Sequence, residues 1–401
     1  MSQMEKALSV FEAYESKDLA VRPDRCVRVR NRHAGCSACM DACPTHAITV
    51  ELNELSVVWG ECLGCEACVA VCPTEVFGSV AAGDEALKAA ALAAAEAADG
   101  LVCFVCRPLY AKVAQLVDPA KTVVVNCMAR VDATLLVDLA AAGVAGIALV
   151  HDACAACALA GAEEAARRAV EGARELVAAF GYAGRMALRD KLPSAIRRQE
   201  EAAFDEESRG FFASMKQEMR QVAGITARTV AEELPGEAVE EEEDPFAGKV
   251  LEDGTLPRVD GQRRKRLLGA VDALATDAPE PEATLQAGLF GRIAINREAC
   301  RSCRMCANFC PTGALRKFDF ADGRLGVKHM PALCVNCGCC RDICPTKALT
   351  VHARVAAKDV ALRTSYAYYM AAPDVAYNRP DTMYRKVQPL FDTDQLYDMQ
   401  H

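Results

Sequence analysis

Most of the chain's 22 cysteines follow one spacing, Cys-x-x-Cys-x-x-Cys-x-x-x-Cys-Pro. The spacing is complete in three places: Cys62, Cys65, Cys68 and Cys72; Cys300, Cys303, Cys306 and Cys310; Cys334, Cys337, Cys340 and Cys344. A fourth copy contains Cys36, Cys39 and Cys43, and His33 stands where its first cysteine would fall. Thiolates at this spacing typically ligate [4Fe–4S] clusters, so these residues predict one-electron chemistry.

Two other uses of clustered thiols are structural zinc and disulfide bonds. Zinc sites usually show two separated Cys-x-x-Cys pairs rather than four thiols in one short run followed by proline. Disulfides need an oxidising compartment, and the N-terminal residues contain neither a twin-arginine pair nor an apolar signal segment. The spacing therefore favours iron–sulfur clusters over both alternatives.

When two such motifs are paired, the fourth cysteine of each ligates the cluster of the other. For this chain the rule predicts three complete ligand sets: Cys300, Cys303, Cys306 and Cys344; Cys334, Cys337, Cys340 and Cys310; Cys62, Cys65, Cys68 and Cys43. We therefore predict four [4Fe–4S] clusters, the last of which has Cys36, Cys39 and Cys72 and needs one more ligand.

The missing ligand of that irregular set has two candidates. Cys26 lies upstream of Cys36, and a longer loop would bring it back to the cluster. His33 occupies the regular position and would ligate through a ring nitrogen. A third possibility is that neither binds and the cluster lacks one iron. Because thiolate is the usual cubane ligand, the sequence favours Cys26.

One further cysteine lies inside a motif without occupying a ligand position. Cys339 stands between Cys337 and Cys340. Its side chain is expected to point away from the cluster and to pack as a small apolar group.

The rest of the chain must position these motifs, and its pattern predicts an α+β multidomain architecture. Residues 1–22 have apolar side chains at helical spacing and are expected to form a helical arm. Residues 23–80 form the first two-cluster unit, with strands at 48–52 and 56–59 making a hairpin between the motifs. Residues 286–355 repeat that unit.

In residues 81–185 the spacing of the apolar residues differs from that of the cysteine-rich units. Short apolar runs at 101–105, 122–125 and 146–150 alternate with helical segments, which predicts a small parallel α/β domain. Five cysteines lie at or just past the ends of these strands: Cys103, Cys106, Cys127, Cys154 and Cys157. Because the carboxyl ends of parallel strands meet at one edge of a sheet, these thiols are expected to meet there.

Residues 186–285 are predicted to be a helical and acidic connector. Helices are expected at about 200–233 and at 263–274, with a like-charge block at 240–245 between them. The run Arg263–Arg266 is interpreted as the basic face of an amphipathic helix rather than as a nucleic-acid site.

Residues 356–401 form an extended tail that carries six of the nine tyrosines. The six are Tyr366, Tyr368, Tyr369, Tyr377, Tyr384 and Tyr397. Tyrosine is enriched at interface cores, so the part of the tail from about Arg363 onward is expected to dock on a partner subunit. The alternative is that the tail folds back over its own unit.

Two resemblances to known families extend these expectations. The paired motifs resemble two-[4Fe–4S] bacterial ferredoxins. The segments Cys103–Cys106, Val125–Asp132 and Gly146–Cys157 resemble the iron–sulfur delta subunit of methyl-viologen-reducing hydrogenases. That resemblance implies a central [2Fe–2S] cluster and electron relay between a hydrogenase and a flavin-bearing partner. The chain departs from the family at Asp152, which stands where a cysteine would align, so either Cys154 replaces that cysteine or the site is altered. The alternatives to a cluster are a Cys₄ zinc site, which is the main rival, and no metal.

The composition narrows the class of function. A net charge of −9 argues against nucleic-acid binding, and the sequence contains no apolar run long enough to span a membrane. The expectation is a cytoplasmic electron-transfer subunit of an oxidoreductase complex, with no direct membrane span. Its partners would be a hydrogenase, formate dehydrogenase or aldehyde oxidoreductase at one end and a flavin or heterodisulfide-reductase-like subunit at the other.

The runner-up is a catalytic or electron-bifurcating reductase subunit. That function needs a flavin, nicotinamide or molybdenum site, and no Gly-x-Gly-x-x-Gly follows a predicted strand. An iron–sulfur regulator of nucleic acid is disfavoured by the acidic charge.

Overall fold

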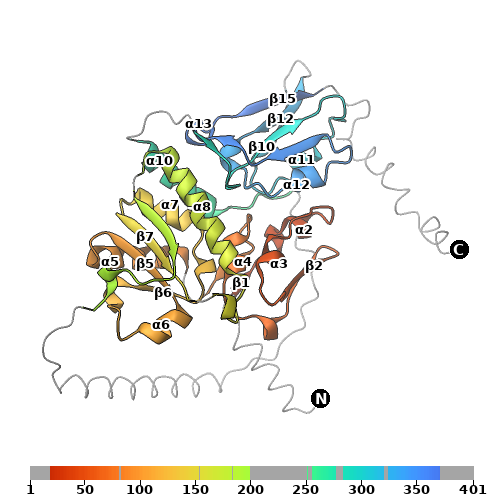
Figure 1. Cartoon of the computed structure of the whole chain (residues 1–401). Coiled ribbons are helices and arrows are strands. Elements are labelled where there is room, and N and C mark those ends of the chain that lie inside the picture. Colours follow the sequence, from red (N-terminus) through yellow and green to blue (C-terminus); the bar gives the residue numbers. More distant parts are fainter. Residues whose placement is uncertain are drawn as a thin grey trace, which may run out of the picture.

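The computed structural model contains three packed units (Figure 1). The N-terminal unit is red to orange, the central sheet with its helices is orange to green, and the C-terminal unit is cyan to blue. The structure describes residues 19–80, 83–152, 154–182, 184–198, 251, 255–276, 283–319 and 324–370.

The N-terminal unit is built from two short antiparallel ladders. Its elements are β1 (Leu19–Val21) paired with β4 (Phe77–Ser79), β2 (Ile48–Glu51) paired with β3 (Glu54–Val57), and the helices α2 (Val27–Arg30), α3 (Ala38–Ala42) and α4 (Ala67–Val71). The predicted hairpin is confirmed. The helical arm is wrong for residues 19–21, because their backbone groups pair with β4 instead; residues 1–18 lie outside the described residues.

The central domain is a parallel four-stranded sheet in the order β6-β5-β7-β8. Its strands are β5 (Leu101–Cys106), β6 (Val123–Val125), β7 (Gly146–Val150) and β8 (Arg185–Arg189), and its helices are α5 (Asp84–Ala97), α6 (Arg107–Val113), α7 (Ala133–Ala141) and α8 (Glu163–Ala179). The three predicted strands are confirmed, as is the parallel α/β class. The sequence analysis did not predict β8, because its apolar run is only three residues long and an arginine stands at each end of the strand.

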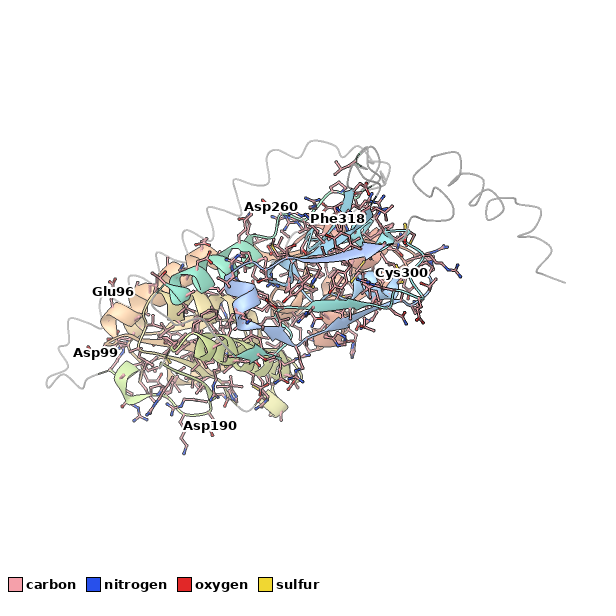
Figure 2. All side chains as sticks on the ribbon, turned by 90° about the horizontal axis from the view of Figure 1, so that it is seen from above. Glu96, Asp99, Asp190, Asp260, Cys300 and Phe318 are labelled. Carbon is pink, nitrogen blue, oxygen red and sulfur yellow. The ribbon has the colours of Figure 1, made fainter. Side chains whose placement is uncertain are left out.

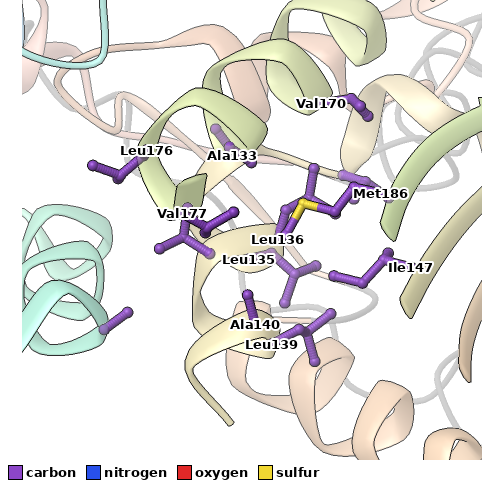
Figure 3. Packing of buried hydrophobic residues seen from close by; sticks show 14 of the residues in the cluster. Ala133, Leu135, Leu136, Leu139, Ala140, Ile147, Val170, Leu176, Val177 and Met186 are labelled. Carbon is purple, nitrogen blue, oxygen red and sulfur yellow. The ribbon is translucent and has the colours of Figure 1, made fainter. Parts of the chain in front are cut away.

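The main core of this domain lies on one face of the sheet. Leu135, Leu136 and Leu139 of α7 pack against Ile147 of β7, Met186 of β8 and α8, as Figure 3 shows. Asp132 begins α7, since its side chain accepts a hydrogen bond from the Leu135 N–H at 2.9 Å. Helix α6 covers the opposite face, where Cys103 and Val105 point.

The C-terminal unit repeats the two-motif plan with additional strands. Its elements are β9 (Thr284–Leu285) paired with β14 (Val355–Ala356), β10 (Arg292–Ile295) paired with β13 (Leu349–His352), the sheet of β11 (Leu315–Asp319), β12 (Leu325–His329) and β15 (Tyr366–Met370), and the helices α11 (Met305–Asn308), α12 (Cys339–Asp342) and α13 (Ala357–Ala361).

The first part of the tail belongs to this unit, which corrects the docking prediction for its tyrosines. Strand β15 pairs with β12, and the Tyr368 hydroxyl donates to the Ile293 carbonyl at 2.6 Å. Tyr369 packs edge-on against Phe318, with ring centroids 5.5 Å apart. The backbone of β15 thus pairs with the edge of β12, whose N–H and C=O groups would otherwise be unpaired. Residues 371–401, including Tyr377, Tyr384 and Tyr397, lie outside the described residues.

Helix α10 (Gln262–Ala275) confirms the second predicted connector helix and packs against α7 and α13. Its basic run is not a solvated face, because the side chains of Arg263 and Arg266 are only 13% exposed. Each arginine finds partners in neighbouring units, and Lys265 alone of the four faces solvent. The expected helix at 200–233 and the acidic block at 240–245 lie outside the described residues.

Candidate iron–sulfur sites

The three complete motifs share one backbone shape. In each, the second and fourth residues after the first cysteine have left-handed φ angles: Gly64 (62°) and Glu66 (60°), Ser302 (56°) and Arg304 (55°), Asn336 (51°) and Gly338 (74°). Such residues turn the chain sharply between the cysteines, which lets one short loop present three thiols to one cavity. The irregular motif differs, because Ser37, four residues after His33, has φ −124°.

Three cavities are each lined by four predicted ligands. They are the inner C-terminal cavity (Cys310, Cys334, Cys337 and Cys340), the outer C-terminal cavity (Cys300, Cys303, Cys306 and Cys344) and the outer N-terminal cavity (Cys43, Cys62, Cys65 and Cys68). Each cavity combines the first three cysteines of one motif with the last cysteine of the motif paired with it, as the crossed arrangement predicts. All 22 thiols are free. Among the described residues, no group of three or more Cys, His, Asp or Glu is placed to hold a single metal ion.

The chemistry of these cavities fits an iron–sulfur cubane. Burial raises the pKa of Cys334 to about 11 and holds the pKa of Cys337 and Cys340 well above that of a free thiol. Four thiolates therefore require a compensating positive charge, which cluster iron supplies. The Leu315 N–H donates to the Cys310 sulfur at 3.3 Å, which favours the thiolate at that position.

The irregular motif also gathers four thiols. Burial, then the charges of Cys72 and Cys26, raise the pKa of Cys39 to about 12, and the same two thiols act on Cys36. Cys26, Cys36, Cys39 and Cys72 thus form an inner N-terminal set. Cys26 is buried, whereas His33 is exposed. The structure brings Cys26, and not His33, to this set; ligation by Cys26 stays a prediction.

Four thiols of the central domain meet at the carboxyl edge of the sheet and form the central site. Cys106 ends β5, Cys127 follows β6, and Cys154 and Cys157 follow β7. Burial, then the charge of Glu163, and after it the charges of Cys106 and Cys157, raise the pKa of Cys154 to about 11. Asp152 lies beside these thiols, since its charge also contributes to the raised pKa of Cys154, and its carboxylate forms an ion pair with Lys112.

Cys103 is not brought to the central site. It is fully buried in the second core of the domain, where it packs with Val105, Val117 and Ile196. Side chains alternate across a strand, so Cys103 and Cys106 point to opposite faces of β5. We therefore correct the sequence prediction and treat Cys103 as a core side chain.

The central site abuts the N-terminal unit. Cys127 packs in one apolar cluster with Cys65, and the Asn126 side chain donates to the Gly64 carbonyl at 3.2 Å. Arg130, almost fully buried, forms an ion pair at 3.0 Å with Glu66, which lies inside the same cysteine loop. The loop that wraps the outer N-terminal cavity is therefore fixed to the edge of the sheet.

The two ferredoxin-like units also contact each other directly, through a junction centred on Cys339. This side chain is 1% exposed, and it packs against Val27 and Ala34 of the N-terminal unit in a cluster that includes Cys36 and Cys337. Beside it, the Gly35 N–H donates to the Asp342 carboxylate at 2.8 Å. The prediction that Cys339 is a packed side chain is confirmed, but its packing partner is the other unit, which no local pattern indicates.

The five thiol sites therefore form a continuous series. Thiols of neighbouring sites lie close enough for their charges to act on one another. The central site meets the outer N-terminal cavity through Cys127 and Cys65, and that cavity meets the inner N-terminal set through Cys68 and Cys39. The inner N-terminal set meets the inner C-terminal cavity through Cys36, Cys339 and Cys310, and this cavity meets the outer C-terminal one through Cys340 and Cys306. The central site stands at one end of this series and the outer C-terminal cavity at the other. Figure 2 shows Cys300 far from Glu96, Asp99 and Asp190 of the central domain.

Comparisons with known families agree with this division. Two regions match models of the 4Fe-4S dicluster domain, residues 34–77 and 299–348. Residues 101–217 match the family of the methyl-viologen-reducing hydrogenase delta subunit. No curated protein and no solved structure matches the chain. Within the described residues, every helix is too short or too polar to cross a membrane.

The chain is thus an iron–sulfur electron-transfer protein. It carries two 4Fe-4S dicluster domains, which imply four [4Fe–4S] clusters, flanking a domain related to the hydrogenase delta subunit.

Proposed function

We propose that the chain is a relay subunit that passes single electrons along a linear series of five clusters between two partner enzymes. The contact between the two dicluster domains carries this proposal, because it joins both cluster pairs into one path. The inner and outer sites would each hold one cubane, and the central site a [2Fe–2S] cluster. The chain's own contribution is to space, bury and hydrogen-bond the clusters.

In this relay the central domain is a terminus rather than a midpoint, although it lies between the two ferredoxin units in the sequence. Because the delta-subunit family is named for a hydrogenase, the partner at this end would be a hydrogenase or a similar donor such as formate dehydrogenase. A flavin or heterodisulfide-reductase-like subunit would contact the end formed by the outer C-terminal cavity. Residues 371–401 stay a candidate partner contact.

The central cluster is tested by Cys127→Ser, with Cys103→Ser as a matched control in the same domain. Loss of one ligand at the sheet edge is expected to abolish one EPR signal of the reduced protein and to leave the cubane signals intact. Cys103→Ser is expected to retain all signals, because that side chain lies on the other face of β5. Zinc at this site, detected by anomalous scattering, would contradict the proposal and remove the donor end of the relay.

The path between the two dicluster domains is tested at Asp342. Asp342→Ala removes the carboxylate that accepts the Gly35 N–H, and a hydrogen bond to a charged group contributes about 1.5–3 kcal/mol. We expect weaker spin–spin interaction between the two inner clusters in the EPR spectrum of the fully reduced protein. Asp342→Asn keeps an acceptor oxygen and should restore the interaction.

Asp41→Ala is the matched control for that experiment. Asp41 is also a carboxylate near the inner N-terminal set, but it accepts a hydrogen bond from Ser37 of its own unit. It should leave the spin–spin interaction unchanged. An undiminished interaction in Asp342→Ala, with all clusters present, would show that the electrons do not need this junction.

A further inference from the structure

His329 is a buried histidine that faces the inner C-terminal cavity. It ends β12, is 0% exposed, and lines the cavity together with Cys310 and Cys334. Within the part of the chain that the structure describes, neither ring nitrogen has a hydrogen-bond partner. Burying an unsatisfied donor or acceptor is costly, so a partner must come from what fills the cavity.

The protein side of the cavity offers few polar groups. Most of the lining is apolar or sulfur, including Ile293, Leu315 and Val351. Thr312 also contributes to the lining, but its hydroxyl donates to the Leu333 carbonyl at 2.7 Å. Burial, and secondarily the charge of Arg292, lower the pKa of His329 to about 4, so the ring is neutral and carries one N–H donor.

We propose that the ring N–H of His329 donates a hydrogen bond to a sulfur atom of the cluster in the inner C-terminal cavity. This inference rests on the proposed cubane at that cavity. A hydrogen bond to cluster sulfur stabilises the more negative, reduced state and raises the reduction potential. His329 is thus a tuning residue, which makes this cluster a better electron acceptor than it would be with an apolar neighbour.

The internal repeat supplies a natural comparison. His329 stands five residues before Cys334, and Val57 stands five residues before Cys62. Their Cα atoms occupy matching register positions, since His329 pairs with Leu315 and Val57 pairs with Ile48. Val57 lines the outer N-terminal cavity as His329 lines the inner C-terminal one. The two cavities therefore differ at one equivalent position by a hydrogen-bond donor.

This difference gives the relay a direction. The outer N-terminal cavity is the cubane site next to the central domain, and the inner C-terminal cavity lies immediately beyond the junction. A higher potential beyond the junction favours electron flow from the N-terminal unit into the C-terminal unit.

The test is a reciprocal exchange in the full, anaerobically purified holoprotein, using His329→Val and Val57→His. Redox titration followed by EPR measures the midpoint potential of each cluster. His329→Val should lower one cubane potential by about the equivalent of a tenfold change in the reduction equilibrium, or about 59 mV for a one-electron couple. Val57→His should raise the potential of a different cubane. His329→Asn, which keeps an N–H donor, should recover part of the loss.

The outcomes separate this inference from the relay itself. Unchanged midpoint potentials in His329→Val, with the iron content retained, would overturn the role of His329 and leave the relay standing. If His329→Val loses its cluster, the test rests on Val57→His, and the absence of a positive shift in any cubane midpoint potential of that variant would overturn the role of His329. Altered potentials in a protein that passes no electrons between its partners would overturn the relay and keep the hydrogen bond.

Discussion

Arg263→Met is expected to destabilise the folded chain by about 3–5 kcal/mol, the cost of breaking a buried ion pair from one side. Arg263 lies on α10, and its guanidinium forms an ion pair with Asp132 of the central domain at 3.0 Å. The same group donates to the carbonyls of Ala70 and Cys72 in the N-terminal unit, each at 3.1 Å. Methionine fills similar space but leaves the buried Asp132 carboxylate without its counter-ion and removes the guanidinium hydrogen bonds to these carbonyls.

Chemical denaturation followed by cluster absorbance measures this loss. Arg167→Met is the control, because Arg167 forms an exposed pair with Glu163 one helical turn away, and such pairs contribute only about 0.3–0.5 kcal/mol. Asp132→Asn added to Arg263→Met should recover part of the stability, since asparagine still begins α7 and carries no charge. Equal stability of Arg263→Met and the parent protein would mean that α10 does not join the units.

Cys26→Ala is expected to convert one cubane to a [3Fe–4S] cluster or to remove it. Cys26 is the thiol that completes the inner N-terminal set with Cys36, Cys39 and Cys72. Because this set stands at the junction, its loss should also interrupt electron transfer between the two dicluster domains. EPR of the oxidised protein and iron analysis would measure the change, against about eighteen irons expected in the parent protein, about sixteen in four intact cubanes and two in the central cluster.

The control for Cys26 is the other candidate ligand of the same motif. His33→Ala should leave the spectrum and the iron content unchanged, because the His33 side chain is exposed and its backbone N–H donates to Asn31 at 2.9 Å. A [3Fe–4S] signal in His33→Ala, with an intact spectrum in Cys26→Ala, would reassign the ligand.

The cluster loops and the α/β class are predictable because both depend on local order. A motif of Cys-x-x-Cys-x-x-Cys holds its three thiols on one short loop, whatever surrounds it. The strands β5 and β7 are short runs of buried apolar residues whose length and flanking helices define them. The crossed position of Cys344 or Cys310 follows from the same pairing of adjacent motifs.

Other features depend on which segments meet, and the sequence alone cannot provide that. Cys103 and Cys106 lie in one apolar run, so the sequence predicts a shared site, but side chains alternate along β5 and these two point to opposite faces of the sheet. The tyrosines of the tail suggest a partner surface, but β15 pairs with an open strand edge within its own unit. The basic residues of α10 have the pattern of a solvated face, but acceptors many residues away pack against them.

The amino-acid sequence by itself determined the chemistry of this protein, namely the number of thiol loops, their crossed pairing and the parallel sheet that ends in further thiols. The tertiary structure decided the order of the sites. The Gly35–Asp342 hydrogen bond and the packing of Cys339 join residues about 300 positions apart, and burial places His329 against a cavity whose cysteines come from two motifs. Spacing along the chain sets which atoms can hold one cluster, whereas contact between distant surfaces sets which cluster lies next to which.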